Sequence, residues 1–456
     1  MTEENPQRKN ESRSTRPTGQ EFARFVASNW GQPEDVATTA IAAAPYAASR
    51  RERLSAAFPG QRIVVAAGDY AVRSNDTDYR FRPHSDFAYL TGLGMDHEPG
   101  AVLVMEPSES GHDSTLYVIP PAGPGEEGFF ADPRAGEFWI GRRPGLAEFA
   151  AMTGIATRAL ADLPRGVRVT GQPSKAVQRV LAQMRMVKDA YEIQQLRDAV
   201  EATVGGFERV ITQLPRAIAH KRGERVIEAT FDGHAREEGN AVGYETIAAA
   251  GAHATTLHWI RNTGQVRHGD LVLLDAGVEV ESLYTADITR TFPVDGQFTP
   301  VQRRVYDVVR EAADAGFAVT RPGAKFIDVH RAAMEVIERH LRAWGIVPDS
   351  TDPDAGLFRR WMVHSTSHHL GLDVHDCSAA KRELYLDGTL EEGMVFTIEP
   401  GLYFKENDLA VPAELRGIGV RIEDDVLVTR EGYENLSAAL PRTADDVEAW
   451  MARLRG

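Results

Sequence analysis

The chain has 456 residues, 43% of them hydrophobic and 26% charged, which is the balance of a globular protein with two or three domains. Its formal net charge is −15 and it contains no long run of lysine or arginine, so it lacks the basic surface that a nucleic-acid-binding protein needs. A single cysteine, Cys377, excludes an intrachain disulfide and a zinc site built from several thiolates.

The sequence predicts neither a membrane span nor a secretory signal. No stretch of about 18 consecutive apolar residues occurs, which is the length that a membrane-spanning helix needs. Residues 1–20 are polar and charged, so they are predicted to form a disordered tail and lack the apolar core of a signal peptide. Together with the lack of disulfides, these features predict a cytoplasmic protein.

The N-terminal part of the chain is predicted to contain a helical extension followed by a small domain. Residues 21–60 include an alanine-rich stretch that indicates short helices. Residues 61–186 are predicted to form an α/β domain, because short apolar runs bounded by turn residues are typical of buried strands. These runs are QRIVVAAG, AVLVME and TLYVIPP, and a loop dense in proline and glycine follows at 120–128.

Two helix starts have clear signals in the second half. A long amphipathic helix begins near Asp189, since apolar residues recur at three- and four-residue steps, and it is expected to end at Pro215. A second helix has Thr299 as its N-cap, Pro300 at its first position and Gln302 three residues after the cap, which is a capping box.

Residues 187–456 are predicted to form a second domain with helices and strands in mixed order. A further helix is predicted over 328–345, and strands are predicted at 271–275, 286–294, 394–399 and 420–428. This order does not follow a regular β-α-β alternation, so the fold class is α+β.

Familiar catalytic motifs are absent from the sequence. His364 and His368 have the spacing of an H-E-x-x-H zinc motif, but Ser365 stands where the glutamate base should be. There is also no phosphate-binding P-loop, no G-x-S-x-G nucleophile motif and no C-x-x-C pair. A single motif therefore does not identify the chemistry.

Four carboxylates lie in or beside apolar strand sequence, where an isolated ionised group is costly to bury. They are Asp275, Asp287, Glu399 and Glu423, and the nearest cations in sequence are Arg290 and Arg421. Each acid taken alone is better explained as a strand-end residue that bonds a turn or faces water. The segment 364–376 adds four histidines, His364, His368, His369 and His375. The combination favours a metal site over a set of unrelated surface acids.

At this point the sequence resembles a known family, the Xaa-Pro peptidases. These are the pita-bread metallopeptidases that comprise aminopeptidase P and prolidase. The resemblance rests on five motifs in the family's order, LLDAG (273–277), ADITRTFPV (286–294), SHHLGLDVHD (367–376), TIEPGLY (397–403) and GIGVRIEDD (417–425). Upstream, MRMVKDAYEIQQLRDA (184–199) resembles the entry helix of the catalytic domain. The segment VRSNDTDYRFRPHSDFAYLTGL (72–93) is similar to the N-terminal domain of bacterial aminopeptidase P.

The resemblance implies a C-terminal pita-bread catalytic domain with a smaller N-terminal α/β domain. It places the family's metal ligands on Asp275, Asp287, His368, Glu399 and Glu423. Four carboxylates balance the charge of two divalent ions, and an oxygen-rich set with one imidazole suits Mn²⁺, Co²⁺, Zn²⁺ or Fe²⁺. Resemblance to the bacterial enzymes favours Mn²⁺. Bridging carboxylates would hold the two ions about 3.5–4 Å apart.

The resemblance also implies catalytic roles. Glu399 would take a proton from the attacking water and pass it toward the leaving nitrogen. The residues His258, His364 and His375 would surround the substrate as hydrogen-bond donors to the developing oxyanion.

Tyr244 and Arg421 would hold the ligating carboxylates in orientation. For all five of these supporting residues the alternative is an ordinary structural hydrogen bond. Ser365 departs from the family, which commonly has glycine there. If the position needs a positive φ, serine would be strained and could displace His364.

The expected function is hydrolysis of the bond between an N-terminal residue and a following proline in Xaa-Pro-Yaa peptides. The nearest alternative is a prolidase restricted to Xaa-Pro dipeptides. A methionine aminopeptidase is disfavoured, because that enzyme usually lacks such an N-terminal domain. A third hypothesis is a non-catalytic pita-bread binding protein, although such proteins typically lose metal ligands. The resemblance further suggests a homodimer or homotetramer.

Overall fold

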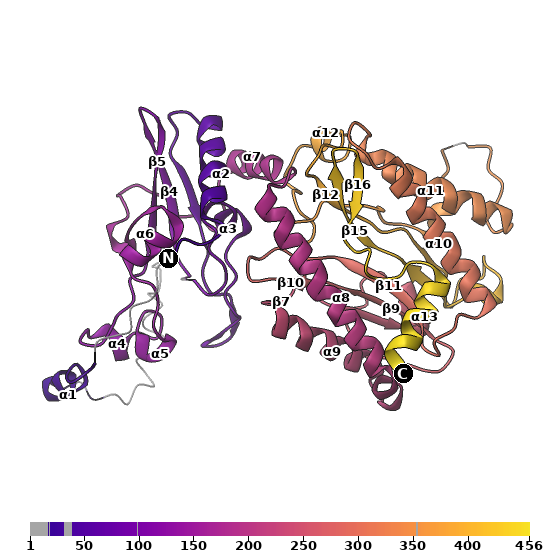
Figure 1. The fold of residues 1–456 in the computed structure, drawn as a ribbon, viewed down its shortest axis with the longest axis horizontal. Helices are drawn as coiled ribbons and strands as arrows, with labels where there is room; N and C mark the ends of the chain where they lie inside the picture. Colours follow the sequence, from indigo (N-terminus) through magenta and orange to yellow (C-terminus); the bar gives the residue numbers. More distant parts are fainter. Residues whose placement is uncertain (1–16, 18, 32–38, 98, 353) are drawn as a thin grey trace. The chain divides into compact units, whose positions relative to one another are not determined.

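The computed structural model describes residues 17, 19–31, 39–97, 99–352 and 354–456. The chain divides into two compact units, Met1–Gln178 and Arg179–Gly456 (Figure 1). This division falls eight residues before the boundary at 186/187 that the sequence suggests, because helix α7 (Lys175–Arg185) continues across it. The predicted disordered tail over 1–20 lies outside the described residues except for Pro17, Gly19 and Gln20.

The first unit is built on a four-stranded sheet with the strand order β1-β4-β5-β6. Strand β4 pairs antiparallel with both of its neighbours, whereas β5 and β6 are parallel. The strands are β1 (Ile63–Ala66), β4 (Val102–Ser108), β5 (Gly111–Val118) and β6 (Ala156–Ala159), with a separate hairpin of β2 (Val72–Ser74) and β3 (Thr77–Asp78). The three apolar runs expected to be strands contain β1, most of β4 and the second half of β5.

The first unit also contains several helices, and the helical extension contributes two of them. They are α1 (Gln20–Val26), α2 (Ala44–Ala57), α3 (Ser85–Thr91), α4 (Gly128–Ala131), α5 (Glu137–Ile140) and α6 (Leu146–Thr153). A short 3₁₀ helix, η2 (Leu160–Asp162), follows β6. Leu54 of α2, Phe149 of α6 and Leu103 of β4 are fully buried and belong to the core of this unit.

The second unit contains two three-stranded antiparallel sheets, β11-β9-β8 and β12-β15-β16. Their strands are β8 (Ile247–Ala250), β9 (Leu271–Ala276), β11 (Ile288–Pro293), β12 (Val395–Ile398), β15 (Asp424–Thr429) and β16 (Gly432–Asn435). Two short pairs complete the set, β7 (Ala241–Val242) with β10 (Val278–Glu279) and β13 (Gly401–Tyr403) with β14 (Gly419–Arg421). The strand expected at 420–428 is thus two strands, β14 and β15, interrupted at Ile422 and Glu423.

In the view of Figure 1 these strands lie between two helix pairs. One pair is α8 (Ala190–Ala219) with α9 (Gly223–Glu238), and the other is α10 (Pro300–Val319) with α11 (Phe326–Ala343). The remaining elements are α12 (Arg382–Tyr385), the C-terminal α13 (Ala444–Arg455) and the 3₁₀ helices η3 (Gly251–Thr255), η4 (Leu357–Trp361) and η5 (Ala413–Leu415). The mixed order of helices and strands confirms the α+β class.

Two helix starts predicted from the sequence agree with the structure, and one predicted helix end does not. Asp189 and Thr299 both form the capping boxes of α8 and α10. The prediction that Pro215 ends α8 is wrong, since the helix continues to Ala219. Proline removes one hydrogen bond, but Leu214 and Ala217 beside it are fully buried, so tertiary packing holds the last turn.

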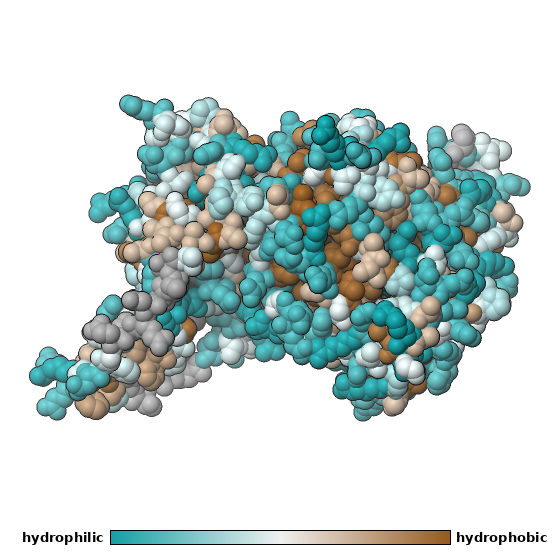
Figure 2. All heavy atoms as spheres, in the orientation of Figure 1, coloured by the Kyte–Doolittle hydropathy of each residue, from teal (hydrophilic) through white to brown (hydrophobic). Residues whose placement is uncertain are grey.

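The surface follows the composition. In the space-filling view of Figure 2 hydrophilic side chains predominate, with apolar side chains gathered in smaller patches. Among the described residues, no helix is both long and apolar enough to cross a membrane.

Candidate active site

Three of the predicted ligands are held by the pairing around β11. Asp275, near the end of β9, lies opposite Thr289 in the β9–β11 register. Asp287 directly precedes β11, and a backbone bridge joins Thr289 to Glu423 between β14 and β15. The break between these two strands therefore places Glu423 beside β11, so strand pairing brings all three carboxylates to one region.

The other two predicted ligands come from a loop that runs beside β12. The Thr397 N–H donates to the His368 carbonyl at 2.9 Å, and the Glu399 N–H donates to the Thr366 carbonyl at 2.8 Å. Another bridge joins His369 to β12. These backbone contacts fix His368 in the loop relative to Glu399 at the end of the strand.

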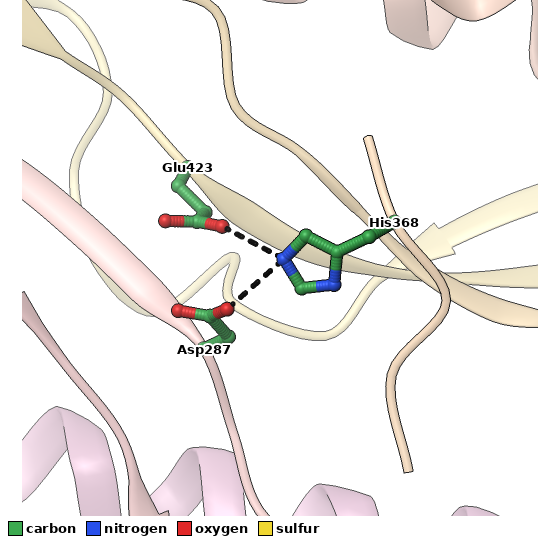
Figure 3. A group of neighbouring side chains, drawn as sticks. All are labelled: Asp287, His368 and Glu423. Atoms are coloured by element: carbon green, nitrogen blue, oxygen red, sulfur yellow. Dashed lines mark ion pairs between the residues drawn. The ribbon is translucent and has the colours of Figure 1, made fainter. Parts of the chain in front are cut away.

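The side chains meet around the His368 ring. Its Nε2 lies 3.1 Å from Asp287 Oδ2, 3.7 Å from Glu399 Oε1 and 3.9 Å from Glu423 Oε1. Figure 3 shows Asp287 and Glu423 pointing toward this nitrogen. One ligand atom from each of Asp287, His368 and Glu423 lies within 4.8 Å of the others, close enough to hold a metal ion together. Asp275 joins the group through Tyr244, whose hydroxyl is 2.6 Å from Asp275 Oδ1 and 2.5 Å from Asp287 Oδ1.

Burial and the repulsion between neighbouring carboxylates shift several pKa values in this cluster. Burial, with the charges of Asp287 and Asp275, raises the pKa of Glu399 to about 8, although His368 and Arg421 oppose the shift. Burial also raises the pKa of Asp275 and raises that of Glu423 well above its usual range. For His368, burial lowers the pKa but the hydrogen bond and charge of Asp287 outweigh it and raise the pKa to about 9.

These shifts describe carboxylates that are short of positive charge. Buried acids in such a group are either protonated or neutralised by cations. Two divalent ions would supply the missing charge, and carboxylate oxygens with one imidazole nitrogen are suitable donors for them. The residues present therefore fit a two-metal centre.

Arg421 and Tyr244 contact the carboxylates as hydrogen-bond donors. Arg421 Nη2 donates to Asp275 Oδ2, its Nε donates to Thr289 Oγ1 at 3.1 Å, and its Nη1 donates to the Tyr403 hydroxyl at 3.1 Å. Burial, followed by the charges of Asp275 and Asp287, raises the Tyr244 pKa well above its usual range. Tyr244 consequently remains a protonated donor.

The three predicted substrate histidines lie around the cluster. His364 Nε2 is 2.8 Å from the Tyr403 hydroxyl, and its Nδ1 is 3.6 Å from Glu399 Oε2. Burial lowers the His364 pKa to about 3, so the ring is neutral. The His375 ring meets the His368 ring edge-on, with centroids 4.4 Å apart. His258 is exposed, and its charge adds to burial, the largest cause of the lowered pKa of both His364 and His375.

Ser365 is accommodated without the strain considered above. It is not among the non-glycine residues with positive φ in the described part of the chain. Its carbonyl oxygen instead lies 2.6 Å from His364 Nδ1, which fixes that ring. Serine in place of glycine therefore leaves His364 facing Glu399 and Tyr403.

Four residues of this region make contacts that the sequence did not predict. Thr289 donates to Glu423 Oε2 at 2.7 Å, and Tyr403 bonds both Arg421 and His364. Both residues lie inside motifs quoted from the sequence, and this position was the one sign that they could belong to the site. Asp425 accepts the Asp287 N–H at 3.1 Å and His330 accepts the Thr366 N–H at 3.3 Å. Asp425 is also the last residue of a quoted motif (417–425), whereas nothing in the local sequence distinguishes His330 from an ordinary polar residue.

Comparisons with known proteins agree with this geometry. The model of metallopeptidase family M24 matches residues 194–430, and the model of the aminopeptidase P N-terminal domain matches residues 47–177. Xaa-Pro aminopeptidase 1 of Streptomyces coelicolor is 48% identical, over 96% of this chain and 93% of the relative. Xaa-Pro aminopeptidase of Escherichia coli K12 is 32% identical, over 87% of this chain and 95% of the relative.

Solved structures give the same result. The low-pH form of E. coli aminopeptidase P has a TM-score of 0.79 at 30% identity, covering 91% of this chain and all of that chain. Proline aminopeptidase P II from Yersinia pestis has a TM-score of 0.77 at 31% identity, covering 89% of this chain and 99% of that chain.

Proposed function

Because the chain belongs to metallopeptidase family M24 and carries an aminopeptidase P N-terminal domain, we propose that it is an Xaa-Pro aminopeptidase. Its substrates are Xaa-Pro-Yaa peptides, and it hydrolyses the bond before the proline. The observation that supports the proposal is the proximity of the five predicted metal ligands, of which three lie close enough together to share one ion. The five are Asp275, Asp287, His368, Glu399 and Glu423.

These five residues hold two divalent ions, for which Mn²⁺ is our first choice and Co²⁺, Zn²⁺ or Fe²⁺ are alternatives. When bound, such ions would supply Lewis-acid activation of the attacking water and of the scissile carbonyl. The raised carboxylate pKa values support this assignment, since they report a local deficit of positive charge. Tyr244 and Arg421 orient Asp275 by the hydrogen bonds described above.

The remaining residues handle the proton and the developing charge. Glu399 accepts a proton from the attacking water and delivers it to the leaving proline nitrogen. His258, His364 and His375 donate hydrogen bonds to the oxyanion that forms on the scissile carbonyl. Both ring nitrogens of His364 already have protein partners, Nδ1 the Ser365 carbonyl and Nε2 the Tyr403 hydroxyl, so His364 takes this role only by giving up one of these contacts when substrate binds.

A prolidase is the second candidate, with the same metals but only dipeptides as substrates. The relatives named Xaa-Pro aminopeptidase and the match to the aminopeptidase P N-terminal domain favour the aminopeptidase. The test is to offer Xaa-Pro-Yaa tripeptides beside Xaa-Pro dipeptides after reconstitution with Mn²⁺. Cleavage confined to dipeptides would establish the prolidase instead, and a chain that binds no metal and cleaves neither would be a non-catalytic binding protein.

The assembly and location are further parts of the proposal. We expect a homodimer or homotetramer, which light scattering coupled to size-exclusion chromatography would measure. The single cysteine excludes a stabilising intrachain disulfide and supports a reducing, cytoplasmic location. Fractionation of cells that produce the protein would test the location.

A further inference from the structure

Glu224 is a fully buried carboxylate outside the metal cluster, and four hydrogen bonds saturate it. Its Oε1 accepts from the Ala250 N–H at 2.9 Å and from His253 Nδ1 at 2.7 Å. Its Oε2 accepts from Trp259 Nε1 at 2.8 Å and from the Gly264 N–H at 2.5 Å. Because a carboxylate only accepts, His253 must carry its proton on Nδ1. All four donors come from residues 250–264.

The surroundings of Glu224 require an acidic residue of this shape. It is the second residue of α9, where the free N–H groups of the helix start favour a negative charge. A Cβ on Gly264 would come within 2.7 Å of the Glu224 carboxylate, so only glycine lets the backbone approach this closely. Glutamine at 224 would point an NH₂ group at donors and leave at least one of them unpaired in a buried place.

Segment 250–264 carries His258, the exposed histidine assigned to the oxyanion above. In the described part of the chain the His258 ring has no hydrogen bond that would fix it, so its position depends on the backbone around it. Trp259 directly follows it, and the Trp259 and His253 rings stack with centroids 3.9 Å apart. Glu224 bonds both of these rings and thereby fixes the chain on either side of His258.

The far end of the segment is fixed as well. Asn262 is fully buried with φ 45°, a left-handed conformation that asparagine tolerates. Its side chain accepts the Ala248 N–H at 3.0 Å and donates to the Thr246 carbonyl at 2.8 Å. The segment is therefore tied to β8 at one end and gathered around one carboxylate along its length.

We infer that Glu224 is a positioning residue for catalysis, which holds His258 at the substrate by fixing segment 250–264 through His253 and Trp259. The inference rests on the proposed function, because His258 acts there on the substrate. Glu224 itself is fully buried, and the side-chain hydrogen bonds that the structure gives it all go to segment 250–264.

The test uses the full chain loaded with Mn²⁺ and compares wild type, Glu224→Gln, His258→Ala and the double variant. We expect Glu224→Gln to retain its metal and to lose kcat about 10- to 100-fold, with KM changed less, which is the size of effect typical of residues that orient active groups. In the His258→Ala background, Glu224→Gln should cost no further activity, because its effect passes through His258.

Glu192→Gln is the matched control. Glu192 is also a buried glutamate on a helix of the second unit, and it accepts from the Tyr284 hydroxyl at 2.9 Å and from the Asp189 N–H at 3.0 Å. It should keep wild-type kcat. Trp259→Phe removes one of the four donors and keeps the ring stack, so it gives a milder, several-fold loss of kcat if Glu224→Gln fails to fold. Additive losses in the double variant, or an equal loss of kcat in Glu192→Gln, would overturn the inference.

Hydrogen–deuterium exchange separates this inference from the proposed function. In Glu224→Gln the backbone amides of 250–264 should exchange faster, whereas those of β9 and β11 should exchange at the wild-type rate. In Glu192→Gln the amides of 250–264 should also exchange at the wild-type rate. If the wild type cleaves no Xaa-Pro-Yaa peptide, the proposed function fails, while exchange still decides whether Glu224 fixes the segment. Unchanged exchange over 250–264 in Glu224→Gln refutes the positioning role whatever the activity.

Discussion

Replacing Tyr244 by phenylalanine removes one hydroxyl from the carboxylate cluster and leaves the ring in place. That hydroxyl lies 2.6 Å from Asp275 and 2.5 Å from Asp287, and its raised pKa keeps it a donor. A hydrogen bond to a charged group contributes about 1.5–3 kcal/mol. Since about 1.4 kcal/mol corresponds to a tenfold change, Tyr244→Phe should weaken Mn²⁺ binding about 10- to 100-fold.

The assay is titration of metal-free protein with Mn²⁺ by calorimetry, followed by kcat and KM at saturating metal. Tyr306→Phe is the control, because Tyr306 is a fully buried tyrosine that donates to the Arg442 carbonyl at 3.0 Å, outside the cluster. It should bind Mn²⁺ as the wild type does. An unchanged affinity in Tyr244→Phe, or the same loss in Tyr306→Phe, would refute the role of this hydroxyl.

Three further predictions follow from named contacts. Asp287→Ala should lose metal and activity together, whereas His258→Ala should keep its metal and lose turnover. Elemental analysis measures the bound metal and peptide assays measure the turnover. If both variants stayed fully active, the site assignment would be wrong. His369 is buried with no hydrogen bond to either ring nitrogen in the described part of the chain, and burial lowers its pKa to about 3. The unfolded chain, with a histidine pKa of about 6.5, therefore binds the proton better, so stability falls as the pH falls from about 6.5 toward 3. In urea unfolding His369→Phe should flatten this decline, and an equally steep decline would contradict the argument. Lys188→Met leaves the buried carboxylate of Asp376 short of a partner and should lower the unfolding free energy by about 3 kcal/mol, which a loss below 1 kcal/mol would disprove.

Much of the fold could be predicted because its signals are local. Capping boxes at Asp189 and Thr299 involve residues three positions apart, and apolar runs mark strands through their own pattern. The family could be recognised for the same reason, since each motif is a short contiguous segment. Local signals fail at Pro215, which was predicted to end the helix. Burial of Leu214 and Ala217 outweighs the effect of the proline, and this burial depends on elements distant in the sequence.

The sequence by itself determined the fold class, the family and the short segments in which the candidate ligands lie. Only the tertiary structure decided which polar groups meet. Thr289 and Glu423 are 134 positions apart, and Arg421 reaches Asp275 across 146 positions, so no local pattern could pair them. Glu224 is the clearest case. A glutamate in the first turn of a helix is ordinarily a solvated residue, and it becomes a buried anchor here because the folded chain brings four donors from 250–264 around it.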